Sequence, residues 1–265
     1  MPHKGSQPRA RPPSVAERSP GTLFVVGVPI GHPDDITIRA LDVFRTVSIV
    51  ASENPQATQI LLAHHSITAA VTSYGPRQLQ EKISLLLHRL TQGQDVALVS
   101  DCGMPVILDP GHLLVNGAHA FGIPVRVVPG PSALTAAVAV SGFSGDAIAV
   151  ERPVPNRPHL LPALISRIQR EPRTCVLHTE SRSLARTLGA LAKSLPDRPI
   201  AVTLDLTKPG ETILRGTARQ LLERLQHVSE EADVMMVIEG VEFGTGRKAK
   251  ERRRKRTSHP LVGGS

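Results

Sequence analysis

Short apolar runs alternate with helix-like patterns along most of this chain, and this alternation restricts its fold more than any other feature. The run at 22–28, TLFVVGV, precedes a predicted helix that Asp34 or Asp35 would cap and whose apolar face is Ile36, Ala40, Val43, Phe44 and Val47. Further strands are predicted at 47–52, 95–100 and 124–129, and further helices at 79–90 and 131–142. Strands that alternate with helices predict a largely parallel α/β sheet.

A proline-rich segment at 151–158, ERPVPNRP, interrupts this pattern and marks an internal boundary. A second series follows it, with helices predicted at 159–170, 181–194 and 217–227 and strands at 174–179, 199–206, 211–216 and 233–240. We therefore expect two α/β domains, at 21–145 and 146–244, with disordered tails at 1–20 and 245–265.

The net charge of +8 is concentrated in the two predicted tails, so the middle of the chain is close to neutral. Aromatic residues make up only 2% of the sequence, which argues against a surface that stacks the bases of single-stranded nucleic acid. The C-terminal tail instead carries a run of basic side chains suited to an RNA backbone: Arg247, Lys248, Lys250, Arg252, Arg253, Arg254, Lys255 and Arg256. The alternative is a solvated extension that binds nothing.

The cysteines and histidines give no signal for a metal site. Cys102 and Cys175 lack zinc-type spacing, and the adjacent His64 and His65 lack the i, i+4 geometry of a helical zinc site. We therefore expect these two histidines to end a helix, and no metal to bind. The sequence also has no secretory segment and no apolar run of membrane-spanning length, which leads us to expect a soluble cytoplasmic protein.

Three of the predicted strands end in loops rich in glycine and proline. These loops read GVPIGHP at 27–33, SDCGMP at 100–105 and PGPSA at 129–133. Parallel strands have their carboxyl ends at one edge of the sheet, where ligands of open α/β sheets bind. Stiff loops with little side-chain bulk at this edge favour a ligand cleft, although tight turns at strand ends are also ordinary chain reversals.

The motifs in these loops resemble those of the class III methyltransferases, the tetrapyrrole-methylase superfamily. The resemblance rests on VPIG followed by DDIT, on SD-x-G-x-P followed by DPG, and on PGPSA. It extends from about Thr22 to Gly240 and includes EPRT at 171–174, LTKPGET at 206–212 and VIEG at 237–240. The order and spacing are most similar to the branch that methylates the 2′-hydroxyl of a cytidine ribose in small-subunit (16S) ribosomal RNA.

This resemblance implies a homodimer that binds S-adenosylmethionine in a cleft between its two α/β domains. Carried over position by position, the implied cofactor-binding residues are Pro29, Ile30, Gly31, Ser100, Asp101, Gly103, Ile107, Pro129, Gly130, Pro131, Ser132, Ala133, Thr207 and Glu211. Glycines allow close approach of the backbone, and a sulfonium centre is better matched by carbonyls and a carboxylate than by an amide nest.

The chain departs from this branch at positions expected to face the methyl acceptor. The AEDTRxT segment of the branch is ASENPQAT at 51–58, a histidine–asparagine pair is replaced within 73–76, and PIGN has become PIGH with His32. Glu53 survives in the altered segment and is the candidate for a polar role near the acceptor, the alternative being a surface carboxylate. Three functions stay open: an rRNA ribose methyltransferase, a methyltransferase for a tetrapyrrole or other small molecule, and a catalytically degenerate cofactor- or RNA-binding homologue.

Overall fold

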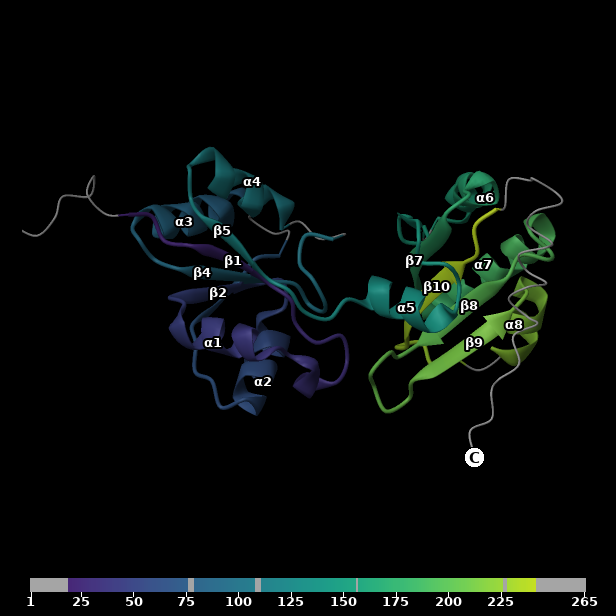
Figure 1. Cartoon of the computed structure of the whole chain (residues 1–265), viewed down its shortest axis with the longest axis horizontal. Coiled ribbons are helices and arrows are strands. Elements are labelled where there is room, and N and C mark those ends of the chain that lie inside the picture. Colours follow the sequence, from purple (N-terminus) through teal and green to yellow (C-terminus); the bar gives the residue numbers. More distant parts are fainter. Residues whose placement is uncertain (1–18, 76–78, 108–110, 156, 226–227, 242–265) are drawn as a thin grey trace, which may run out of the picture. The chain divides into compact units, whose positions relative to one another are not determined.

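The structure is a computed structural model that describes residues 19–75, 79–107, 111–155, 157–225 and 228–241 (Figure 1). The N-terminal tail up to residue 18, the basic run at 247–256, and Asp109 and Pro110 of the DPG motif lie outside the described residues. The chain divides into two compact units, one formed by Met1–Ala136 with Asp205–Glu211 and the other by Ala137–Leu204 with Thr212–Ser265. Each unit is described by itself below.

The first unit contains a five-stranded sheet in which every pairing is parallel, as the alternation of strands and helices predicts. The strand order is β3-β2-β4-β1-β5. The strands are β1 (Leu23–Val26), β2 (Ile49–Ser52), β3 (Val71–Ser73), β4 (Val96–Val99) and β5 (Val125–Val128). Since all five strands run in the same direction, the loops that follow them leave the sheet at one edge.

Helices cover both faces of this sheet (Figure 1). On one face lie α1 (Ile38–Thr46) and α2 (Pro55–His64), and on the other lie α3 (Leu79–Thr91) and α4 (His112–Ala120). Along β4, Leu98 packs in the core beneath α3 and α4, whereas its neighbour Ala97 packs in the core beneath α1 and α2. A strand buried on both faces must be apolar throughout, which is why β4 is a continuous apolar run.

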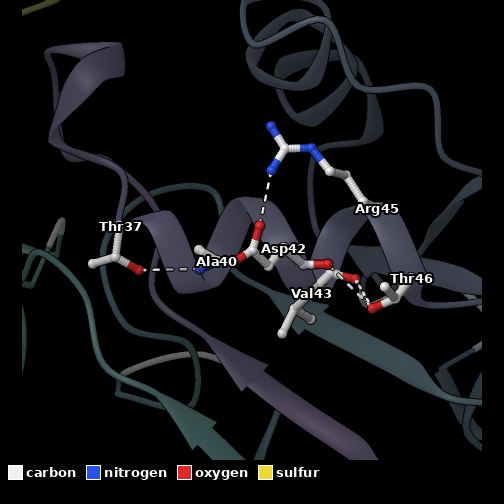
Figure 2. Close-up of polar contacts among 6 residues, drawn as sticks. All are labelled: Thr37, Ala40, Asp42, Val43, Arg45 and Thr46. Carbon is white, nitrogen blue, oxygen red and sulfur yellow. Dashed lines mark hydrogen bonds and ion pairs between the residues drawn. The ribbon is translucent and has the colours of Figure 1, made fainter.

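Helix α1 begins with a threonine cap rather than with either predicted aspartate (Figure 2). The Thr37 hydroxyl oxygen accepts a hydrogen bond from the Ala40 amide at 3.2 Å. The prediction of an aspartate cap is wrong because Asp34 and Asp35 belong to a separate 3₁₀ turn, η2 (Pro33–Asp35), which ends before the helix starts. The helix therefore starts later than predicted, and η2 presents its carboxylates to solvent.

The second unit contains a mixed five-stranded sheet with the order β6-β7-β10-β8-β9. Strands β6 and β7 are parallel, while β10 is antiparallel to β7 and β8, and β8 is antiparallel to β9. The strands are β6 (Ile148–Val150), β7 (Thr174–Glu180), β8 (Ile200–Leu204), β9 (Thr212–Gly216) and β10 (Asp233–Ile238). This confirms a second α/β domain, in which most neighbouring strands run in opposite directions.

One core joins this second sheet to three helices. The helices are α6 (Leu161–Arg170), α7 (Ser181–Ser194) and α8 (Ala218–Arg224), and the short turn η3 (Pro158–Leu160) precedes them. Helix α5 (Ala133–Ser141) carries the chain from the first unit into the second. None of the helices formed by described residues has the length and apolar character needed to cross a bilayer.

Candidate active site

The loops that follow β1 and β4 are joined by a pair of backbone hydrogen bonds. Val28 N donates to Gly103 O at 2.9 Å, and Gly103 N donates to Val28 O at 3.1 Å. Gly103 has φ +74°, a left-handed conformation that glycine adopts without steric cost. Since β1 continues toward β2 on one side of the sheet and β4 toward β5 on the other, this bridge lies at the topological switch point where such sheets bind ligands.

The loop after β5 packs directly against the loop after β1. A Cβ atom added to Gly130 would lie 2.8 Å from the carbonyl oxygen of Gly27, which is closer than real contacts allow. A Cβ atom added to Gly103 would lie 3.6 Å from the carbonyl oxygen of Pro131. The Gly/Pro loops after β1, β4 and β5 therefore form one cluster in the first unit, as expected from parallel strands.

The turn between β8 and β9 also belongs to this unit and contacts the loop after β1. His32 N donates to the Thr207 hydroxyl at 2.9 Å, and a Cβ on Gly31 would lie 2.6 Å from Leu206 O. Thr207 N in turn donates to the Glu211 carboxylate at 2.7 Å. Thr207 has φ +64°, a strained conformation for a β-branched residue that its surroundings must hold in place. The two candidates from the distant LTKPGET motif thus lie with Gly31.

Two neighbouring polar candidates in the loop after β4 differ in their surroundings. Ser100 is buried, and its hydroxyl donates to the carbonyls of Cys102 at 3.0 Å and Gly103 at 3.4 Å, which shapes the loop. Asp101 is exposed, and within the described part of the chain its carboxylate has no hydrogen-bond or ion-pair partner. Asp101 is therefore available to accept hydrogen bonds from a ligand, whereas the Ser100 hydroxyl stabilises the conformation of the loop.

The remaining candidates flank this cluster. Ile107 is 48% exposed at the far end of the loop after β4, beyond Val106, whose φ of +80° marks another strained position. Ile30 is buried beside Gly103, while Pro29 is half-buried. The residues that lead into α5 are exposed or half-buried, namely Pro129, Pro131, Ser132 and Ala133.

Glu53 follows β2 at the same edge of the sheet. Tyr74, which follows the neighbouring strand β3, is instead buried in the core. Tyr74 N donates to Ser52 O at 2.6 Å, and the Tyr74 ring is fully buried in the core beneath α3 and α4. Burial is the main reason that the pKa of the Tyr74 phenol is raised, opposed by a hydrogen bond with the Leu114 backbone and assisted by the Glu53 charge. Tyr74 therefore serves packing, whereas Glu53 is half-buried at the edge.

A family model described as Tetrapyrrole (Corrin/Porphyrin) Methylases matches residues 22–222. The chain belongs to this family. As a tetrapyrrole methylase family member it is an S-adenosylmethionine-dependent methyltransferase, which confirms the class and the cofactor that its motifs predict.

Curated relatives of this tetrapyrrole methylase include two proteins named Ribosomal RNA small subunit methyltransferase I. The protein from Thermotoga maritima is 37% identical over 84% of this chain and 100% of its own length. The protein from Escherichia coli O157:H7 is 33% identical over 85% of this chain and 80% of its own length.

Solved structures of the same family have the same fold. Cobalt precorrin-4 methyltransferase, a cobalamin biosynthetic enzyme, is 21% identical over 82% of this chain and 94% of its own, with a TM-score of 0.60. Uroporphyrin-III C-methyltransferase from Thermus thermophilus, solved with S-adenosylhomocysteine, is 20% identical over 82% and 96%, with a TM-score of 0.58. These similarities confirm the predicted α/β fold class.

Proposed function

We propose that this methyltransferase acts on small-subunit (16S) ribosomal RNA, and that its acceptor is the 2′-hydroxyl of a cytidine ribose. The observation that carries the proposal is the similarity to the Thermotoga maritima protein, which is named as a small-subunit rRNA methyltransferase. This relative is 37% identical, and the match covers the relative's whole length. The tetrapyrrole methyltransferases among the solved structures are only 18–23% identical, so they support the fold but not a small-molecule acceptor.

The loop cluster of the first unit is the proposed site for S-adenosylmethionine. Its backbone carbonyls, its left-handed Gly103 and the exposed carboxylate of Asp101 suit a ligand with amino and hydroxyl donors and a sulfonium charge. In this proposal Gly31 and Gly130 allow the loops to approach one another, and Thr207 with Glu211 fixes the edge of the site. The other residues expected from the family motifs lie in the same loops or at the start of α5: Pro29, Ile30, Ser100, Ile107, Pro129, Pro131, Ser132 and Ala133.

Bound S-adenosylmethionine supplies an electrophilic methyl group, and the chain must position a ribose hydroxyl in line with it. Methyl transfer would form a bond between the hydroxyl oxygen and the methyl carbon and would break the carbon–sulfur bond of the donor. Positioning accounts for most of the acceleration in such a displacement, and the hydroxyl proton must also leave. Glu53, at the carboxyl end of β2, is our candidate to accept or orient this proton.

Binding to RNA is proposed to depend on the basic C-terminal run at 247–256. The rest of the chain is close to neutral, so this run is the main source of attraction to phosphates. A homodimer in the cytoplasm, where small ribosomal subunits assemble, completes the proposal.

The direct experiment is transfer of a labelled methyl group from S-adenosylmethionine to small ribosomal subunits by the purified protein. We expect incorporation into 16S rRNA, mapped to a cytidine 2′-oxygen by its resistance to alkaline cleavage. A variant lacking residues 245–265 should bind RNA more weakly yet keep its affinity for S-adenosylhomocysteine. Incorporation into a tetrapyrrole instead, or equal RNA binding without the tail, would contradict the acceptor and the tail assignments respectively.

A further inference from the structure

One carboxylate and two imidazoles from distant parts of the sequence meet at the surface of the first unit. Asp34 lies in η2, and His64 and His65 lie at the end of α2. His64 Nε2 is 3.0 Å from Asp34 Oδ1, across 30 residues of sequence. One donor atom from each of the three side chains can be chosen so that all three lie within 4.8 Å of one another.

The end of α2 explains how two adjacent histidines can face the same point. Within a helix, side chains at i and i+1 diverge. Here the helix ends at His64, and His65 is its C-cap with φ −95° and ψ 16°, followed by Ser66 at φ +55°. This change of direction brings the two rings together, edge to face, with centroids 4.7 Å apart. The two histidines end a helix, as predicted. Their partner Asp34, 30 residues earlier in the sequence, was not predicted.

Neighbouring backbone groups hold these side chains in place. His65 Nε2 lies 3.1 Å from the carbonyl oxygen of Pro33, the kind of contact that orients metal-binding histidines in proteins. His32 Nδ1 accepts a hydrogen bond from the Asp34 amide, so a third imidazole lies on the same turn.

The donor set matches a metal ion in its chemistry and spacing. Two imidazole nitrogens and one carboxylate oxygen form a common three-ligand set for zinc and other first-row divalent ions, with the remaining positions taken by water. Ligand atoms of a tetrahedral zinc ion lie roughly 3.3 Å apart, which follows from bond lengths of about 2.0–2.1 Å. The observed donor atoms need to approach one another by up to about 1.5 Å to reach this spacing. The side chains of Asp34 and His64 are 64% and 47% exposed, so they have room to move.

We propose that Asp34, His64 and His65 form a binding site for a first-row divalent metal ion of the zinc type. The bound ion fastens η2 to the end of α2. Because His32, which immediately precedes η2, also holds Thr207 through its backbone amide, the ion steadies the turn that follows Gly31. This role is structural, and it does not depend on which acceptor the enzyme methylates.

The test is titration of the full metal-free chain with Zn²⁺ by calorimetry, together with the absorption spectrum of added Co²⁺. We expect His64→Ala and His65→Ala each to weaken Zn²⁺ binding at least tenfold and to remove the Co²⁺ bands that differ from those of the free ion. His88→Ala is the matched control, since His88 is an exposed histidine on α3 of the same unit. Circular dichroism verifies that the variants are folded.

Zn²⁺ affinity that is the same in the wild-type chain, in His64→Ala and in His65→Ala would overturn the proposal. So would a Co²⁺ spectrum identical to that of the ion in buffer. In either case the cluster is a hydrogen-bonded turn only. Because neither measurement requires methyl transfer, failure of this proposal is distinguishable from failure of the rRNA assignment.

Discussion

The two sheets of this protein have the same number of strands but place their loops differently. In the first sheet every strand is parallel, so the glycine-rich loops after β1, β4 and β5 gather at one edge and contact one another. In the second sheet most neighbours are antiparallel, so successive loops leave at opposite ends. Strand direction, more than the composition of any single loop, thus decides where this fold can build a site.

The largest effect on stability is expected at the backbone contact between Gly27 and Gly130, where two loops of the first unit pack together. Gly130→Ala places a Cβ within 2.8 Å of the Gly27 carbonyl, and we expect overpacking to lower the free energy of unfolding by about 1–3 kcal/mol. The matched change in the second unit is Gly189→Ala in α7, where a Cβ meets no atom within 4 Å. There, the better helix propensity of alanine should raise stability by roughly 0.5–1 kcal/mol. Urea denaturation measures both, and equal effects would contradict the difference in packing.

The contact between Gly31 and the turn at 205–211 tests the proposed cofactor site. In Gly31→Ala the new Cβ would lie 2.6 Å from Leu206 O, so the turn must shift. We expect the affinity for S-adenosylhomocysteine, measured by calorimetry on protein that circular dichroism shows to be folded, to fall at least tenfold. Gly210→Ala is the control on the same turn, because its nearest neighbour, Asp205 Oδ2, is 3.8 Å away. If Gly31→Ala binds like Gly210→Ala, the site lies elsewhere.

Tyr74→Phe tests whether Tyr74 serves packing or takes part in the reaction. Tyr74→Phe keeps the buried ring and removes the hydrogen bond with the Leu114 backbone, which should cost about 1 kcal/mol of stability. Methyl transfer should be unchanged, measured at a temperature where both proteins are folded. A large loss of activity at unchanged stability would show that the phenol has a role in the reaction.

A smaller effect is expected at an ion pair of the second unit. The Arg173 guanidinium donates to both carboxylate oxygens of Glu171, at 2.6 and 2.8 Å. This hydrogen bonding is the main reason that the pKa of Glu171 is lowered to about 2. The ionised form therefore stabilises the fold above pH 4.5, and this contribution is lost as the pH falls toward 2. The melting temperature of Glu171→Gln should lie slightly below wild type at pH 7 and approach it below pH 4.5; a gap that widens in acid would contradict this.

Sequence patterns predicted the elements that are regular and buried, and missed others, among them β3 and α4. Strand β4 is a continuous apolar run, whereas β3 has three half-exposed residues and α4 contains an internal glycine, Gly117. The alternation of helices and strands indicates parallel strands, and this does not hold for the second sheet, in which most neighbours are antiparallel. Only the brief β8–β9 connection hints at an antiparallel pair.

For the candidate site, the sequence revealed the loops but not every contact between them. Glycine and proline at successive strand ends indicated the cluster, since parallel strands must bring those ends together. The cluster of Asp34, His64 and His65 gave no such signal, because its members are far apart in sequence and meet only where α2 ends. The core role of Tyr74 was hidden for the same reason, since burial depends on helices that pack over it.

The assignment of Asp205–Glu211 to the first unit means that the two halves of this enzyme are not separable by one cut. A fragment ending at Ala136 would retain all five parallel strands but lose Thr207, the partner of the His32 amide. Split versions or domain exchanges within the family would therefore need to transfer the turn at 205–211 together with the N-terminal part of the chain to keep this contact.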